Sequence, residues 1–153
     1  MTVVDANVLL YAVNADDPTH VPARRWLESA LGSAESVAFS WVVILAFLRM
    51  ATSSRVFGTP LTAPEATAYV EEWLRQPAAV VISPTSRHLA ILSGLLAQTG
   101  SAGNLITDAH LAALAVEHGA RLASFDRDFL RFARHPIDHP ERPDLSRRRA
   151  PLL

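Results

Sequence analysis

The sequence predicts an α/β fold, a three-layer domain in which helices flank a central, mainly parallel sheet of four to five strands. Short apolar segments alternate along the chain with longer segments whose apolar residues recur at helical spacing. This alternation is typical of parallel strands, because each crossover between them usually contains a helix. A chain of 153 residues, half of them hydrophobic, is long enough for one well-buried domain and too short for two ordinary ones.

Four strands and six helices account for the order of elements. The strands are expected at residues 2–4, 37–39, 79–82 and 121–125. The helices are expected at residues 8–13, 22–31, 41–51, 62–75, 86–98 and 108–118. Two helix starts carry a capping signal, the box from Thr62 to Glu65 and the N-cap Thr107. The helix at 41–51 has no charged side chain before Arg49, so we expect it to be mostly buried.

Three aspartates are predicted to meet at one edge of the sheet. The helix at 108–118 advances about 15 Å at ~1.5 Å per residue, and the following strand returns by about the same distance at ~3.3 Å per residue. Asp126 therefore comes back beside Asp108. Asp5 follows the first strand, and parallel strands bring their carboxyl ends to the same edge, where open α/β sheets bind ligands.

Such a group of carboxylates predicts a divalent cation. Three carboxylates close together repel one another unless a cation lies among them, and all-oxygen ligands suit Mg²⁺ or Mn²⁺. Any single aspartate at the end of an element also serves as a cap or turn residue, so the hypothesis depends on the joint placement. Asp128 follows closely and is assigned to the metal as an outer ligand, with hydrogen bonding to the next turn as the alternative.

Composition excludes several other classes. The chain has no cysteine, which rules out disulfides and thiolate metal sites and fits a cytoplasmic protein. It has no apolar run of membrane-spanning length and no signal-type start. Lysine is absent, which argues against receiver domains, and Asn7 stands where haloacid-dehalogenase-type phosphatases need a second aspartate. The histidines show no metal-binding pair, so His88, His110 and His118 are expected to pack or to donate hydrogen bonds.

The composition changes near the end of the chain. Residues 1–134 form the predicted domain, whereas residues 135–153 contain four prolines, the run Arg147–Arg149 and little that could be buried. We expect this C-terminal tail to be extended or disordered, a state typical of segments with few apolar side chains.

Three motifs resemble those of PIN-domain ribonucleases, specifically the VapC-type toxins of bacterial toxin–antitoxin pairs. The first is Asp-Ala-Asn-Val-Leu-Leu-Tyr at 5–11, the second is Gly-Asn-Leu-Ile-Thr-Asp-Ala-His-Leu-Ala-Ala at 103–113, and the third is Ser-Phe-Asp-Arg-Asp-Phe at 124–129. The resemblance covers residues 1–134 and implies a magnesium-dependent endoribonuclease. It also implies a homodimer and a cognate antitoxin whose C-terminal segment lies along the active-site groove.

The resemblance assigns the acidic cluster residue by residue. Asp5, Asp108 and Asp126 match the family's metal-binding carboxylates, and Asp128 lies next to them. One position departs from the pattern, because the family commonly has a glutamate on the helix after the second strand where this chain has Ala46. The alternative hypothesis is a PIN-like module that binds RNA or a protein partner without cutting.

Overall fold

Five parallel strands make up the sheet of this protein. The structure, a computed structural model, describes residues 1–99, 103–126, 129, 132 and 137–138. The strand order is β3-β2-β1-β4-β5, and every neighbouring pair is parallel. The strands are β1 (Thr2–Val4), β2 (Val37–Ser40), β3 (Ala79–Ile82), β4 (Arg121–Ala123) and β5 (Ile137–Asp138). The predicted α/β fold with a central parallel sheet is therefore confirmed.

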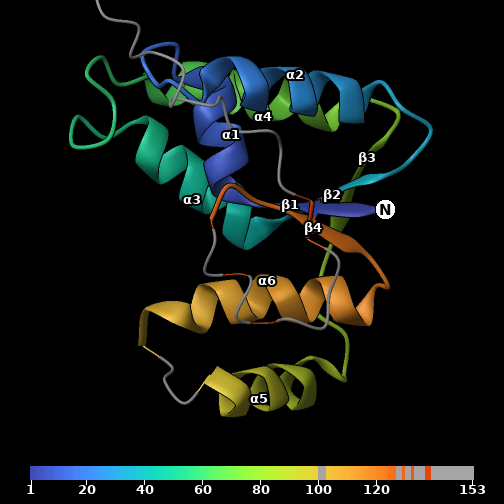
Figure 1. Cartoon of the computed structure of the whole chain (residues 1–153). Helices are drawn as coiled ribbons and strands as arrows, with labels where there is room; N and C mark the ends of the chain where they lie inside the picture. The colour runs from blue at the N-terminus through green and yellow to red at the C-terminus, as the bar shows by residue number, and fades with distance from the viewer. Residues whose placement is uncertain (100–102, 127–128, 130–131, 133–136, 139–153) are drawn as a thin grey trace, which may run out of the picture.

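Helices cover both faces of the sheet. Figure 1 shows four of them on one side and the other two, α5 and α6, on the opposite side. The first group is α1 (Ala6–Val13), α2 (His20–Leu31), α3 (Trp41–Ala51) and α4 (Ala63–Leu74), and the second is α5 (His88–Thr99) and α6 (Ile106–Glu117). No helix among the described residues is long and apolar enough to cross a bilayer.

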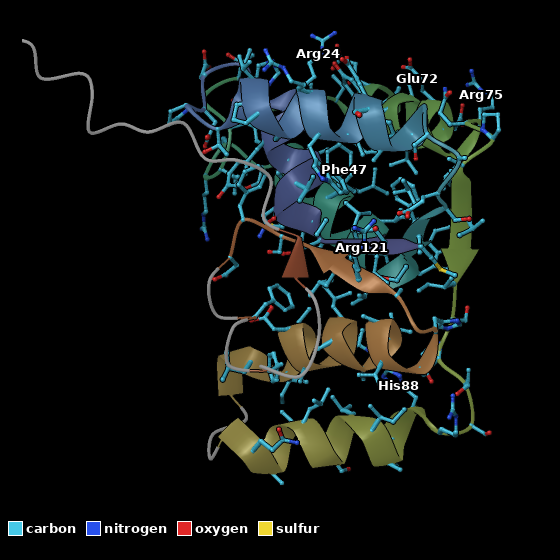
Figure 2. The ribbon with its side chains drawn as sticks, turned by 45° about the vertical axis from the view of Figure 1, so that its right-hand side comes forward. Arg24, Phe47, Glu72, Arg75, His88 and Arg121 are labelled. Carbon is cyan, nitrogen blue, oxygen red and sulfur yellow. The ribbon has the colours of Figure 1, made fainter. Side chains whose placement is uncertain are left out.

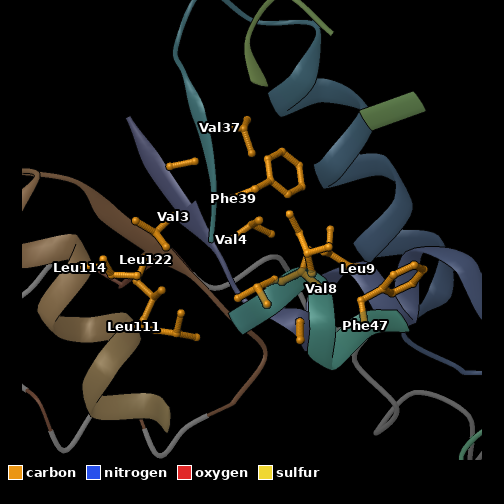
Figure 3. Close-up of a cluster of buried hydrophobic side chains, with 14 of the residues drawn as sticks. Val3, Val4, Val8, Leu9, Val37, Phe39, Phe47, Leu111, Leu114 and Leu122 are labelled. Atoms are coloured by element: carbon orange, nitrogen blue, oxygen red, sulfur yellow. The ribbon is translucent and has the colours of Figure 1, made fainter. Parts of the chain in front are cut away.

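The core lies on both sides of the central strand β1. Successive residues of a strand point to opposite faces, so Val3 and Val4 divide between two apolar layers. Figure 3 shows Leu9, Phe39 and Phe47 on the side of α1 and α3, and Leu111, Leu114 and Leu122 on the side of α6. All these side chains are at most 2% exposed. Burial on both faces explains why β1 has no polar residue after Thr2.

Two helix starts test the capping signals in the sequence. Thr62 and Glu65 form the predicted capping box, in which the Thr62 Oγ1 accepts from the Glu65 backbone and the Glu65 carboxylate accepts from the Thr62 backbone. Helix α6, in contrast, begins at Ile106 with Leu105 as its N-cap, so the prediction of Thr107 as N-cap is wrong. A 3₁₀ turn at Gly103–Leu105 leads directly into this helix and moves its start upstream.

The expectation that α3 is mostly buried is also wrong. Val43, Ile44 and Phe47 face the core, but Trp41 and Leu45 are each 59% exposed. A helix that packs on a sheet covers only one stripe of its surface, whatever the composition of the other stripe. Helix α3 therefore presents an apolar surface that the rest of the described chain leaves open.

Candidate active site at the carboxyl edge of the sheet

The strand order creates a switch point between β1 and β4. From β1 the chain builds outward through β2 to β3, and it then returns to the other side of β1 to add β4 and β5. In open parallel sheets such a reversal leaves a crevice beyond the carboxyl ends of the two strands. Asp5 directly follows β1, and Asp126 lies three residues after the end of β4. The fold thus brings these two predicted residues to the same crevice.

Ser124 joins the two aspartates. Its fully buried hydroxyl donates to Asp5 Oδ2 at 2.8 Å and accepts from the Asp126 backbone N–H at 2.9 Å. The same oxygen accepts from Asn7 Nδ2 at 2.9 Å, and the Asn7 side-chain oxygen accepts from the Phe125 backbone N–H at 3.2 Å. Ser124 and Asn7 therefore tie the segment after β1 to the segment after β4.

Ser124 and Asn7 belong to two of the sequence motifs, but the sequence alone assigned no role to either residue. Small polar residues at strand ends are common in turns, so their type alone does not mark a site. A usable signal was the spacing, because each lies two positions from an aspartate already assigned to the site.

Burial raises the pKa of the Asp5 carboxyl to about 6, and the negative charge of Asp126 adds to this effect. The hydrogen bond from Ser124 acts in the opposite direction, because it stabilises the ionised form. The site therefore holds a carboxylate whose charge is only partly compensated by the described protein atoms. A cation beside Asp5 would supply that compensation.

Asp108 lies in the first turn of α6, at the same edge of the sheet. Helix α6 runs back before β4, so its N-terminus is at the carboxyl ends of the strands, as Figure 1 shows. Within the described residues, no three His, Asp or Glu side chains stand close enough together to hold a metal ion. Asp5 and Asp126 are brought together, and Asp108 is placed at the edge without completing such a group. Asp128 lies outside the described residues.

Ala46 is the sixth residue of α3, and it is partly buried against the core. Helix α3 starts at the carboxyl end of β2, the strand next to β1. No residue between Glu35 and Glu65 is acidic, so this helix contributes no carboxylate to the site.

Comparisons with known proteins agree with this geometry. The sequence model of the PIN-domain family matches residues 2–135. The chain is 50% identical over 140 residues to Ribonuclease VapC37 of Mycobacterium tuberculosis, covering 92% of this chain and 97% of that protein. It is 41% identical over 133 residues to Ribonuclease VapC33 of the same species, covering 87% and 93%. The chain belongs to the PIN-domain family.

Solved structures show the same PIN fold. M. tuberculosis VapC20, described as a toxin that cleaves the sarcin–ricin loop, superposes with a TM-score of 0.67 at 21% identity, over 94% of this chain and all of that chain. VapBC2 from Rickettsia felis, bound to promoter DNA, gives a TM-score of 0.67 at 17% identity, over 92% and 98%. Together with the identities above, they confirm the resemblance to VapC-type PIN proteins.

The raised pKa of Asp5 predicts how metal-free stability depends on pH. A carboxyl whose folded-state pKa is raised destabilises the fold once pH passes its unfolded value near 4, and the loss is complete above about 6. The shift corresponds to roughly 3 kcal/mol. In EDTA, Asp5→Asn should therefore gain stability relative to the native protein between pH 4 and pH 7, measured by urea unfolding.

Asp16→Asn is the matched control, because Asp16 lies beyond the opposite end of α1 and is exposed. A stability difference between Asp5→Asn and the native protein that stays constant across this pH range would contradict the buried, poorly compensated carboxylate.

Ala46→Glu tests whether this helix position faces the metal-binding edge. If it does, the added carboxylate should raise Mg²⁺ affinity and lower the stability of the metal-free protein by repulsion. Thermal melts across a magnesium titration give the answer, with rescue of the variant by metal as the expected result. A variant that is destabilised equally at every magnesium concentration would instead show a carboxylate buried without a partner in the core.

Proposed function

We propose that this PIN domain is the toxin of a type II toxin–antitoxin pair, an endoribonuclease that hydrolyses RNA with Mg²⁺ or Mn²⁺. The observation that carries the proposal is the joining of Asp5 to Asp126 through Ser124 at the switch point of the sheet. The names of its relatives, Ribonuclease VapC37 and Ribonuclease VapC33, support RNA as the substrate.

The donor atoms are carboxylate oxygens, whose chemistry suits a hard divalent cation, but the three described aspartates do not form one metal-sized group in this structure. Asp5, Asp108 and Asp126 would hold it, with Asp128 beside them, and carboxylate oxygens are the ligands that Mg²⁺ and Mn²⁺ prefer. When bound, the cation supplies positive charge that polarises the phosphate and lowers the pKa of water. Magnesium tolerates several water ligands, so the missing carboxylate at Ala46 should weaken metal binding without preventing it.

The protein's own groups position this chemistry. Ser124 and Asn7 fix the Asp5 carboxylate and the backbone of Asp126, so neither segment has to reorganise when substrate arrives. In the hydrolysis a water oxygen bonds to phosphorus while the bond to the 3′ oxygen breaks in line with it. A site whose carboxylates are held in advance lowers the barrier to such a reaction chiefly by orientation.

A second candidate is a PIN-like module that binds RNA or protein without cutting. The observation that favours it is Ala46, which removes one carboxylate from the usual set. The two candidates differ in whether any RNA is cleaved when metal is present.

The cleavage hypothesis predicts a metal-dependent activity that depends on single carboxylates. The purified protein should cut single-stranded or loop RNA only with Mg²⁺ or Mn²⁺, and Asp5→Asn and Asp108→Asn should each lower the rate by at least ~100-fold, because each removes a charged ligand. Cleavage is measured on labelled RNA and on total cellular RNA.

The exposed Asp16→Asn variant serves as the charge-matched control and should cut normally. Normal cutting by Asp5→Asn or Asp108→Asn would show that the site is assigned wrongly. A native protein that binds RNA and never cuts it, in either metal, would favour the binding module.

We also propose a cognate antitoxin as partner, since similar folds occur in the VapBC toxin–antitoxin complexes of Rickettsia felis and Haemophilus influenzae. A basic antitoxin side chain could take the place of the metal by pairing with Asp5 or Asp108. A cavity of about 530 Å³, lined partly by Leu27, Tyr69 and Trp73, offers apolar anchorage on the layer of α1, α2 and α4.

This blocking arrangement predicts that metal and antitoxin compete. Added Mg²⁺ should weaken the co-expressed complex, and Asp5→Asn should reduce both the affinity and its magnesium dependence, as measured by titration calorimetry. Tyr69→Ala should weaken the complex without changing that dependence, because it removes apolar contact alone. An affinity indifferent to magnesium and to Asp5→Asn would contradict the blocking model.

We further propose a homodimer, in which a second copy covers Leu45 on α3 and Leu89 on α5. Leu45 and Leu89 are 59% and 73% exposed. Replacing either with aspartate should convert a species of twice 16.6 kDa into a monomer in light scattering, because a charge cannot be buried there cheaply. Val21→Asp, at an equally exposed site on α2, is the control. A native protein that is monomeric at high concentration would refute the dimer.

A further inference from the structure

A cavity of about 420 Å³ lies at the carboxyl edge of the sheet and has no role in the chemistry described above. Its walls are mostly apolar and come from the start of α3, the end of β3 and helix α5, with Trp41, Ile82 and Leu92 among them. Four polar residues also line it, Ser40, Ser83, Thr107 and His110. The volume lies within the range of about 300–1,000 Å³ typical of small-molecule sites.

The cavity is next to the carboxylates. Strands β1 and β2 pair with Thr2 opposite Val37, and this register continues to place Asp5 opposite Ser40. Neighbouring strands are about 4.8 Å apart. Thr107 lines the cavity and directly precedes Asp108. A ligand bound through its phosphate at the carboxylates would therefore have its adjacent group beside this cavity.

A chain of hydrogen bonds ends at the cavity. The buried Glu117 carboxylate binds His88 Nδ1 at 2.7 Å, and His88 Nε2 binds His110 Nδ1 at 2.8 Å. Glu117 also accepts from the backbone N–H and the hydroxyl of Thr85, at 3.1 and 2.6 Å. Burial acts to raise the pKa of Glu117, but the bonds from Thr85 and His88 outweigh it and lower that pKa. Figure 2 shows His88 between the two helices of this layer.

The chain of hydrogen bonds leaves one ring nitrogen open, His110 Nε2. An ionised Glu117 can only accept, so His88 Nδ1 donates to it. When both rings are neutral, His88 Nε2 accepts from His110 Nδ1 and His110 Nε2 is left as an acceptor, which is the form that the test below examines. That atom bonds to no residue that the structure describes, and no buried side-chain nitrogen or oxygen among those residues lacks a partner. His110 Nε2 is therefore accessible, on a ring that lines the cavity.

Trp41 complements this acceptor. Trp41 lines the cavity and is 59% exposed, so its ring is open to a ligand in the single protomer. Proteins that bind single-stranded RNA stack unpaired bases on exposed aromatic rings and read the base edges by hydrogen bonds. The ring of Trp41 and the acceptor on His110 match that pattern. They lie beside the carboxylates, because Thr107 directly precedes Asp108 and Ser40 belongs to the strand next to β1.

We propose that this cavity binds one unpaired base of an RNA strand, with Trp41 stacking on the base and His110 Nε2 accepting from an N–H donor on its edge. The proposal rests on the proposed ribonuclease function, since a cation held by the carboxylates would place the neighbouring phosphate. His88 is a positioning residue in this scheme, because it acts on the ligand only through His110.

The test uses the full chain in EDTA, where RNA stays intact and no cation holds the phosphate, so that three labelled hexamers with identical phosphates report the base site alone. One carries adenine at every position, one carries purine, which lacks the edge donor, and one is abasic. Fluorescence anisotropy should show the adenine hexamer bound roughly 5- to 150-fold tighter than the abasic one. Trp41→Ala should remove most of this advantage and Trp41→Phe should keep it. Val21→Ala, an exposed apolar control on another helix, should have no effect.

The hydrogen bond has its own readout. The native protein should prefer adenine over purine by about 2- to 13-fold, the value of one neutral hydrogen bond. His110→Ala and His88→Phe should both abolish this preference while leaving the affinity for the purine hexamer nearly unchanged. A role of the two histidines in folding alone would instead lower the affinity for all three hexamers together.

Equal binding of the adenine and abasic hexamers by the native protein would overturn the proposal. So would a Trp41→Ala variant that dissociates a dimer in light scattering and keeps its affinity for the adenine hexamer, because a second copy would then occupy the cavity. Base-dependent binding by a protein that never cuts RNA would refute the ribonuclease and leave the base site standing. Cutting by a protein with no base preference would do the reverse.

Discussion

The burial of the Asp5 carboxylate is the constraint on which the site depends. A charge at the end of the central strand is costly, since both faces of that strand are packed and Asp5 itself is only partly exposed. Ser124 partly offsets this cost with one short hydrogen bond, and Asn7 keeps the Ser124 hydroxyl turned the right way. The negative charge of Asp5 is thus only partly compensated, and this favours a positive charge at one point of the sheet edge.

The sheet order turns this preference into a site. Because β1 lies between β2 and β4, the residues that follow it face segments from both halves of the chain. One half supplies Ser40 and the start of α3, and the other supplies Ser124, Asp126 and, from the opposite helical layer, Asp108. Carboxylates and an apolar cavity thereby lie side by side along a single edge, which suits a ligand that is a charged backbone carrying flat, apolar groups.

The elements were predictable because their periodicity is strong. Parallel strands and the lengths of helix and strand predicted that Asp5, Asp108 and Asp126 lie at one edge, but the three do not form one metal-sized group in the described structure. What the pattern could not show was which surfaces stay open. Trp41 and Leu45 are as apolar as Phe47, and only the packing of α3 on the sheet separates them. The start of α6 was misplaced because a 3₁₀ turn precedes it, and such a turn has no clear pattern of its own.

Hydrogen-bonded groups that join distant segments were the hardest part to foresee. Ser124 meets Asn7 and Asp5 across 117 and 119 positions, and His88 meets His110 and Glu117 across 22 and 29. Serine, asparagine and histidine have roles in turns, caps and cores as well as in sites, so their identity carries little information until the strands are paired. The three aspartates were easier to place, since each lies just after a predicted strand or at the start of a predicted helix.

The central place of β1 also bears on how the protein is made. The first strand to leave the ribosome pairs with β4, whose last residue is Ala123, and a chain emerges from its N-terminus first. Until residues 121–126 have been synthesised, β1 has an unpaired edge, and Asp5 has neither Ser124 nor Asp126 beside it. A growing or prematurely terminated chain thus lacks an assembled site, because that site forms only when the sheet is nearly complete.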